Sequence, residues 1–299
     1  MARGVSHIHG ARQDLALFGD QFRRLLPDVV IDMCAFSERD AEQAVTAFRG
    51  LARRLIVVSS QDVYRAYGRF HSRDGGPLEP VPFDEDSPVR EQLYPYRGMI
   101  DGLDDYEKLL VEQAAMDSPL LRPTIVRLPM VYGERDYQHR LALELQRMDD
   151  GRPAILLEET FARWRWTRAY VENAAAAIVL AAADERAARR VYNAGDAEAL
   201  SYAGWLREVG RAAGWQGRVV IVPDGTLPKQ LRPPRADYTQ DLVADTGRIR
   251  FELGFEEPVP GEDGLARTIA WERTNRQPAS DGLFDYEAED RVLAEMGVS

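Results

Sequence analysis

A chain of 299 residues, 45% of them hydrophobic, is long enough to bury the core of one large α/β domain or of two smaller lobes. The net charge of −11 argues against binding to a nucleic-acid backbone, which depends on clustered Lys and Arg. A single cysteine, Cys34, excludes an internal disulfide and fits a reducing cytoplasm, and the four scattered histidines argue against a metal site. Because the sequence has neither an apolar export signal nor an apolar run of about 18 residues, we expect no membrane association.

The elements predicted in the first half alternate between strands and helices. They are a strand at 5–9, a helix at 14–26, a strand at 29–31, a helix at 40–52, a strand at 55–58, a helix at about 105–116, a strand at 124–128 and a helix at 138–148. The runs at 29–31 and 55–58 are continuously apolar, as in strands covered on both faces, so they predict βαβ units and a parallel sheet. The Pro- and Gly-rich segment 60–103 is too long for a plain connector and is predicted to be functional.

Beyond residue 151 the predicted elements are shorter. They are a strand at 154–157, an Arg/Trp segment at 163–168, an Ala-rich helix at 171–183, a strand at 191–193, a helix from 201, a strand at 219–222, and helices at 246–253 and 264–273. The acidic end from Asp281 to Glu295 is predicted as a helix, docked or frayed, with a largely solvated surface. The fold class is therefore α/β, with a division near residue 150.

Five short motifs follow one another in the chain. They are RLIVVSSQDVY at 54–64, KLLVE at 108–112, RLPMVYG at 127–133, YVEN at 170–173 and VYNAG at 191–195. Each is weak alone, but in this order they make residues 29–275 resemble the NAD-dependent epimerase/dehydratase family, the extended short-chain dehydrogenases. The resemblance implies that residues 1–150 form an incomplete Rossmann-like, doubly wound parallel sheet that binds NAD or NADP. It also implies a smaller α+β substrate lobe at 151–299, with some exchange of chain between the two.

In this family a Ser, a Tyr and a Lys act on a substrate hydroxyl, and the motifs place Ser60 and Lys108 at two of these positions. Hydride transfer at a carbinol requires a group that moves the hydroxyl proton. A tyrosine, with an ordinary pKa of about 10, does this near neutral pH only if a nearby cation lowers its pKa, and a lysine supplies that cation. The alternative is that Ser59 and Ser60 merely end a strand and Lys108 is a solvated helix residue.

The identity of the tyrosine is open, because the family position four residues before Lys108 holds Asp104. Asp104 and Glu107 form a capping-box pattern, which predicts that Asp104 is the N-cap of the Lys108 helix. A carboxylate there would be a poor proton donor at neutral pH. Tyr106 lies two residues from Lys108, about 200° away on a regular helix, so it reaches the site only if the helix starts late. The remaining alternatives are a loop tyrosine, Tyr94 or Tyr96, and no usable tyrosine.

The resemblance also implies further contacts. Those to the cofactor are Cys34, Ala35, Ser59, Lys108, Leu128 and Pro129, and those to the substrate are Tyr94, Tyr96, Met130, Arg163 and Arg165. The Arg/Trp segment suits a diphosphate, since Arg binds phosphate in a bidentate manner and Trp offers a stacking face. The alternative for the Arg/Trp segment is an amphipathic surface hairpin. The alternative for Cys34 is a buried position at the end of a strand.

The first residues do not match the family. Gly4, Gly10 and Gly19 are too scattered for the glycine-rich turn that receives a pyrophosphate, and Ala11 replaces the acid expected on the adenosine side. A start codon placed too late, pairing with a second chain or degeneration would each explain this, and we favour the first. We predict poor binding of NAD or NADP.

Two functions follow from the sequence. The first is an NAD(P)-dependent epimerase, dehydratase or reductase acting on a nucleotide-sugar-like or other hydroxylated substrate. The second is a catalytically silent homologue that binds a ligand or partner. We expect a cytoplasmic homodimer with a small-molecule substrate, and no nucleic-acid or membrane partner.

Overall fold

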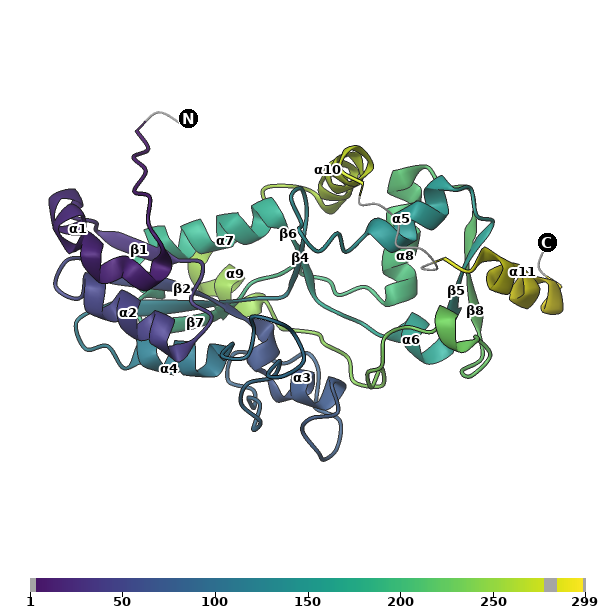
Figure 1. The fold of residues 1–299 in the computed structure, drawn as a ribbon, viewed down its shortest axis with the longest axis horizontal. Coiled ribbons are helices and arrows are strands. Elements are labelled where there is room, and N and C mark those ends of the chain that lie inside the picture. The colour runs from purple at the N-terminus through teal and green to yellow at the C-terminus, as the bar shows by residue number, and fades with distance from the viewer. Residues whose placement is uncertain (1–3, 277–283, 298–299) are drawn as a thin grey trace.

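Four parallel strands form the main sheet of the computed structural model, which describes residues 4–276 and 284–297 (Figure 1). In spatial order they are β1 (Val29–Asp32), β2 (Arg54–Ser60), β3 (Arg122–Leu128) and β7 (Arg190–Asn193). The register pairs Ile31 with Ile56, Ile56 with Thr124 and Ile125 with Val191. The four strands predicted at 29–31, 55–58, 124–128 and 191–193 are therefore confirmed.

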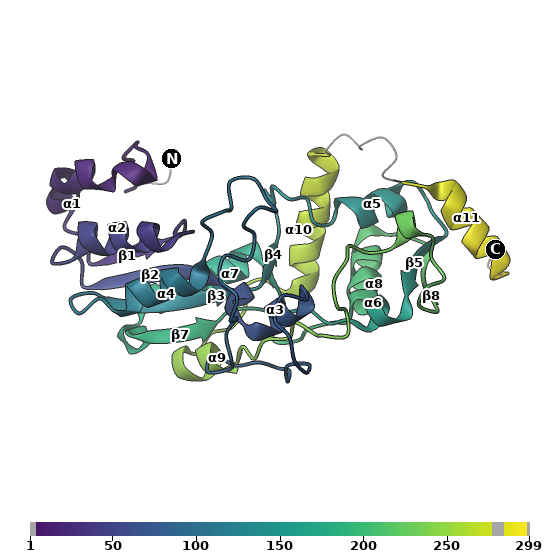
Figure 2. The same ribbon diagram turned by 60° about the horizontal axis from the view of Figure 1, so that its bottom comes forward.

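Helices cover both faces of this sheet, because alternate side chains of its central strands point to opposite sides. They are α2 (Glu38–Phe48) and α4 (Lys108–Met116) on one face, and α7 (Val171–Ala183) and α9 (Gly247–Leu253) on the other. Leu55 and Val57 of β2 pack with the first pair, and Ile56 and Val58 with the second. Figure 2 shows the resulting order from β1 to β7, with α9 beyond β7.

The chain before β1 differs from the prediction. Residues 5–9 form no strand, and the predicted helix is divided into the 3-10 helix η1 (Arg12–Phe18) and α1 (Gly19–Leu25). The strand prediction is wrong because, within the described residues, no neighbour offers the backbone partners that an extended segment at 5–9 needs. The two short helices pack against α2 (Glu38–Phe48), where Phe22 contacts Phe48 at 4.7 Å between ring centroids.

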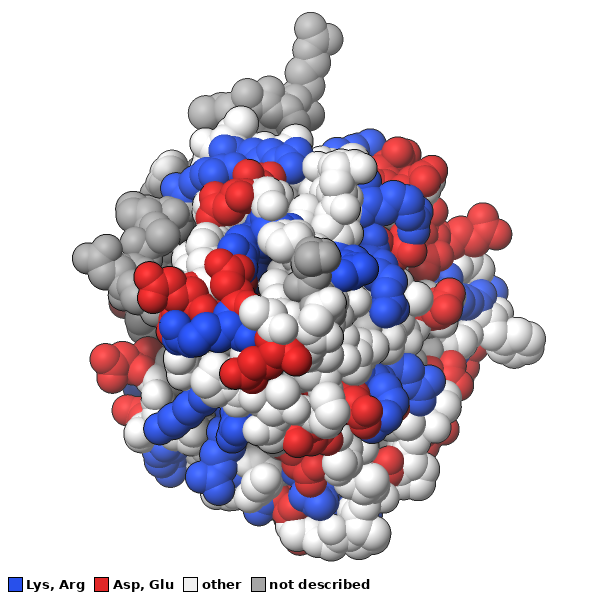
Figure 3. Space-filling model, turned by 90° about the vertical axis from the view of Figure 1, so that its right-hand side faces the viewer, with Lys and Arg blue, Asp and Glu red and all other residues white. Residues whose placement is uncertain are grey.

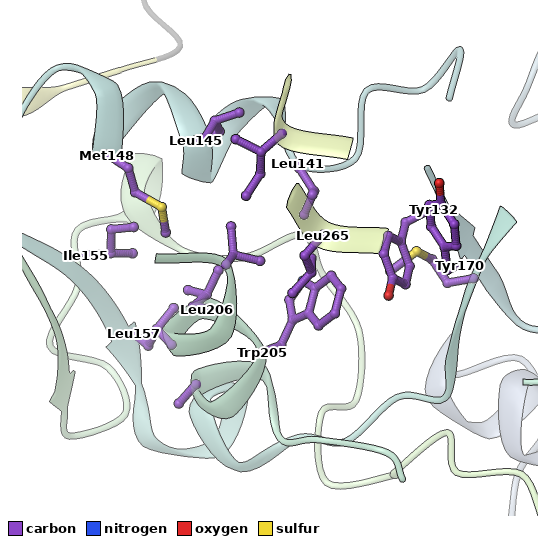
Figure 4. Packing of buried hydrophobic residues seen from close by; sticks show 14 of the residues in the cluster. Tyr132, Leu141, Leu145, Met148, Ile155, Leu157, Tyr170, Trp205, Leu206 and Leu265 are labelled. Atoms are coloured by element: carbon purple, nitrogen blue, oxygen red, sulfur yellow. The ribbon is translucent and has the colours of Figure 1, made fainter. Parts of the chain in front are cut away.

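Beyond β3 the chain builds two small parallel sheets. One pairs β4 (Met130–Tyr132) with β6 (Arg168–Tyr170), and the other pairs β5 (Ala154–Glu158) with β8 (Arg218–Val222). The accompanying helices are α5 (Ala142–Asp149), α6 (Glu159–Arg163), α8 (Tyr202–Ala213) and α10 (Gly261–Thr274). Their apolar side chains form one core, in which Trp205 meets Tyr132 edge-on at 5.0 Å (Figure 4).

The remaining short elements connect these layers. They are η2 (Gln61–Val63), α3 (Arg65–Phe70), η3 (Glu185–Ala187) and η4 (Lys229–Leu231). Within residues 4–276 and 284–297, no helix is both long and apolar enough to cross a bilayer.

The acidic end forms α11 (Tyr286–Glu295), and its apolar side is docked. Val292 and Leu293 are buried, and Glu289 forms ion pairs with Arg147 and Arg152. The predicted helix is therefore docked rather than frayed, and its other side is exposed. Residues 281–283 lie outside the described residues. Figure 3 shows this end of the molecule, where acidic and basic side chains are interspersed.

Candidate functional site

The candidate site lies at the carboxyl end of β2, where parallel sheets of this kind bind their ligands. Ser60 ends β2 half-buried, and Lys108 begins α4 with only 4% of its surface exposed. The Lys108 ammonium donates to the backbone carbonyls of Ala35, at 2.6 Å, and Val58, at 3.0 Å. Lys108 is therefore not a solvated helix residue but a buried cation below the end of the sheet.

The helix that carries Lys108 starts three residues later than predicted. Its N-cap is Glu107, whose carboxylate accepts from the Leu109 amide at 2.9 Å. Glu107 is fully buried and forms an ion pair with Arg90 at 2.9 Å. The prediction that Asp104 caps this helix is wrong, because the pairing with Arg90 draws Glu107 into that position. Asp104 is exposed and instead accepts from the Gly98 amide at 2.8 Å.

The late start leaves Tyr106 outside the helix, and its phenol reaches the site. The hydroxyl donates to Oδ2 of Asp62 at 2.8 Å, and the Asp62 amide in turn donates to the Ser60 hydroxyl at 3.1 Å. The Lys108 ammonium lies 5.9 Å from the centre of the Tyr106 ring. The structure thus brings Ser60, Tyr106 and Lys108 together, although Tyr106 and Lys108 have a spacing that would separate them on a regular helix.

Of the two loop tyrosines, the structure brings only Tyr96 to this place. Its hydroxyl donates to the same Oδ2 of Asp62 at 3.2 Å, and its ring centroid lies 5.2 Å from that of Tyr106. The ring of Tyr94 lies under the guanidinium of Arg97 instead, 3.7 Å from its carbon.

Asp62 is the residue of this site that sequence reasoning missed. Its side chain is buried, with 7% of the residue exposed, and two phenols donate to Oδ2. Oδ1 has no hydrogen-bond partner in the described part of the chain. Its position two residues after Ser60, just past the end of a buried strand, is the signal that could have identified it.

Burial and charge set the protonation states here. Burial raises the pKa of Tyr106 well above its usual value, and the Asp62 carboxylate raises it further. The expected lowering of this pKa by Lys108 is therefore not found, because desolvation and the nearer carboxylate outweigh the ammonium. Burial also raises the pKa of Asp62 and lowers that of Lys108.

Of the residues expected to contact a cofactor, some lie at the carboxyl end of the sheet near Ser60 and Lys108, and others do not. Leu128, the last residue of β3, is half-buried and in register with Ser60, and Pro129 follows it, also half-buried. Ala35 contributes one of the carbonyls that hold Lys108. Cys34 is exposed, so the buried alternative for it is wrong: this strand end lies at the open edge of β1. Ser59 faces inward and donates to Glu112 at 2.5 Å, and this carboxylate also pairs with buried Arg127 at 2.7 Å.

The other residues expected to contact a substrate have partners within the protein. Met130 is buried in the hydrophobic core that also contains Tyr132 and Trp205. Arg163 lies 3.6 Å from Glu159, and Arg165 lies 2.9 Å from Asp241. Trp164, between the two arginines, is buried and stacks on Phe70 at 5.1 Å.

The residues gathered at the carboxyl end of β2 fit one half of a dinucleotide. Ser60, Tyr106 and Lys108 provide a hydroxyl, a phenol and a cation beside the open end of β2, which suits a nicotinamide riboside and a carbinol. On the adenosine side, β1 is the first strand of the described residues, so no described strand leads through a glycine-rich turn into a helix before it. Gly10 is packed against the Phe18 ring, where a Cβ would lie 2.1 Å from a ring carbon. The described part of the chain also holds no cluster of His, Cys, Asp or Glu suited to a metal ion.

Comparisons with known proteins agree with this geometry. No family model matches the sequence. The chain is 28% identical over 226 residues to a dTDP-glucose 4,6-dehydratase of Streptomyces niveus, a match that covers 75% of this chain and 58% of the relative. The chain therefore spans less than two thirds of that curated relative.

Solved structures show the same fold. The UDP-glucose 4-epimerase of Thermotoga maritima, solved with UDP-glucose, has a TM-score of 0.64 at 18% identity, over 93% of this chain and 87% of that one. The Bordetella bronchiseptica enzyme WbmG, in complex with NAD and UDP, has a TM-score of 0.65 at 18% identity, over 91% and 80%. The predicted α/β fold with a Rossmann-like parallel sheet is confirmed, as is the likeness to epimerases and dehydratases of the short-chain dehydrogenase type.

Proposed function

We propose that this protein is an NAD(P)-dependent oxidoreductase of the epimerase or dehydratase type that acts on a carbinol of a nucleotide-sugar-like substrate. The observation that carries the proposal is the convergence of Tyr106, Ser60 and Lys108 at the end of β2. The relatives support the substrate class, since they are named for dTDP-glucose and UDP-glucose or bind UDP.

Each side chain has a chemical role in this proposal. A bound nicotinamide supplies a hydride acceptor or donor. Ser60 holds the substrate oxygen through its hydroxyl, and Tyr106 moves the proton of that oxygen. Lys108 places a positive charge beside the phenol and the ribose, and Leu128 and Pro129 exclude water from the adjacent face. The chain binds the whole dinucleotide poorly, because the described residues do not form the phosphate-binding turn.

The hydrogen bonds of Lys108 favour a second candidate function. In this candidate the protein is a catalytically silent homologue that binds a ligand or partner. Both contacts of Lys108 are to backbone carbonyls, so in this arrangement its ammonium is directed into the protein. The predicted homodimer stays a prediction.

Nicotinamide binding separates the two candidates. We expect reduced nicotinamide mononucleotide and NADH to bind with Kd values within about tenfold of each other, which is about 1.4 kcal/mol, because only the nicotinamide half has its contacts. Fluorescence titration of both ligands measures this. If neither ligand binds to the folded chain, the silent homologue is supported. If NADH binds more than about 100-fold more tightly than the mononucleotide, the proposal of an absent phosphate site is wrong.

A matched pair of variants locates the binding. Leu128→Trp places a large ring at the carboxyl end of β3, beside Ser60, and should abolish mononucleotide binding. Leu120→Trp makes the same change before the other end of β3, where the side chain is exposed, and should leave binding unchanged.

A further inference from the structure

Asp62 is held rigidly beside Tyr106 by contacts of its own backbone. Its amide donates to the Ser60 hydroxyl at 3.1 Å, and its carbonyl accepts from Nε of Arg90 at 2.6 Å. The carboxylate is thereby fixed under two phenols, with Oδ2 accepting from Tyr106 and Tyr96. This places a second proton-accepting group in direct contact with the proposed catalytic phenol.

The carboxylate has no cation of its own. Asp62 forms no ion pair in the described part of the chain: the guanidinium of Arg90 is engaged by Glu107, and the ammonium of Lys108 by two carbonyls. The titratable or charged groups that face Asp62 are Arg90, Lys108, Tyr67, Tyr96 and Tyr106. A buried carboxylate without an ion-pair partner is costly to keep charged, so it takes up a proton readily.

We propose that Asp62 is a positioning residue that receives the phenolic proton of Tyr106 during catalysis. The inference rests on the proposed function, and it deepens that function by naming where the proton goes. In the resting site Tyr106 is a neutral phenol that donates to Asp62, so it cannot serve as a base until this proton has left.

The proton moves in two coupled transfers. As the substrate carbinol becomes a carbonyl, its O–H proton passes to the oxygen of Tyr106, and the original phenolic proton passes to Oδ2 of Asp62. The hydride from the same carbon goes to oxidised NAD(P), the oxidant of the proposed function. The phenol ends the step neutral and Asp62 ends it as a carboxylic acid, and reduction of the carbonyl reverses each transfer.

Tyr106 is the better placed of the two phenols for this role. Its hydroxyl is 2.8 Å from Oδ2, against 3.2 Å for Tyr96. Tyr106 also has the Lys108 ammonium beside its ring, 5.9 Å from the ring centre. Tyr96 therefore acts as a fixed second donor that orients the carboxylate.

Titration of the ligand-free protein tests the pairing without cofactor or substrate. The probe is the ¹³Cζ NMR signal of Tyr106, assigned with Tyr106→Phe. In Asp62→Asn the neutral amide no longer repels a phenolate, so we expect Tyr106 to ionise at least about one pH unit lower than in the parent protein. Asp104→Asn, an exposed change in the same loop, should leave the signal unchanged. An unshifted Tyr106 midpoint in folded Asp62→Asn overturns the proposal.

A reciprocal measurement covers the case in which Asp62→Asn does not fold. Tyr106→Phe removes a donor to the charged carboxylate, so the ¹³Cγ signal of Asp62 should titrate at higher pH than in the parent. An unchanged or lower midpoint contradicts the proposal.

Kinetics separates failure of this inference from failure of the proposed function. Oxidation of the substrate requires charged Asp62, so the rate of oxidation should fall as the pH drops through the Asp62 pKa. In Asp62→Asn this acidic fall of the pH–rate profile should disappear, and kcat should drop by about 10²-fold. If the titrations of Tyr106 and Asp62 are coupled but no turnover is found, the proposed function is wrong and the pairing of the two side chains stands. If Asp62→Asn turns over substrate with an unaltered pH profile, the proposed proton transfer to Asp62 is wrong.

Discussion

Tyr106→Phe is expected to lower kcat/KM by about 10²- to 10⁴-fold, the usual contribution of a positioned acid or base. The variant keeps the ring against Tyr96 and Phe36 and removes only the hydroxyl that donates to Asp62. The measurement is turnover of dTDP-glucose or UDP-glucose at millimolar NAD⁺, a concentration chosen to offset weak cofactor binding.

Tyr94→Phe is the matched control, because it removes the same atom from a tyrosine of the preceding loop whose ring lies under Arg97. Its kcat/KM should stay within about twofold of the parent, a difference well below 1 kcal/mol. Full activity of Tyr106→Phe would exclude this phenol as the proton carrier and would return the role to Tyr96 or to no tyrosine.

Glu107→Gln is expected to reduce the free energy of unfolding by about 3–5 kcal/mol, because it leaves the buried guanidinium of Arg90 without its charge partner. Both side chains are almost fully buried, with exposures of 3% and 0%. Glu107 also accepts from the amides of Tyr94 and Leu109, so the loop and the helix start depend on it. Denaturant unfolding followed by circular dichroism measures the change.

Asp105→Asn provides the contrast within the same segment. Asp105 is exposed and lies 3.4 Å from exposed Arg97, and such surface pairs contribute about 0–1 kcal/mol. Pairing Glu107→Gln with Arg90→Met should recover part of the loss, since removing both charges is far less costly than removing one. Equal stabilities of Glu107→Gln and Asp105→Asn would show that the buried pair does not hold the start of α4.

The elements of the sheet could be predicted because their signals are local. The apolar run at 55–58 is buried within β2, and the Ala-rich run at 171–183 became α7 with the predicted limits. The run at 29–31 also forms a strand, but at the edge of the sheet, so Ile31 is exposed and the prediction that this strand is covered on both faces is wrong. Ser60 and Lys108 were found through the motifs that resemble the epimerase/dehydratase family, which place one at the end of a strand and the other in a helix. The segment at 5–9 failed because a strand is not local: it needs a neighbour to accept its hydrogen bonds.

The sequence by itself determined the fold class, the four strands of the main sheet, and Ser60 and Lys108 as candidate site residues. Only the tertiary structure decided which tyrosine joins them. Local spacing predicted that Asp104 is the N-cap and that the Tyr106 side chain points away from Lys108. In the structure Arg90, from a distant part of the loop, forms an ion pair with Glu107, and the helix starts only at Lys108. That ion pair forms only when both charges are buried together, and it places Tyr106 on Asp62, a contact between residues 44 positions apart that no periodicity encodes.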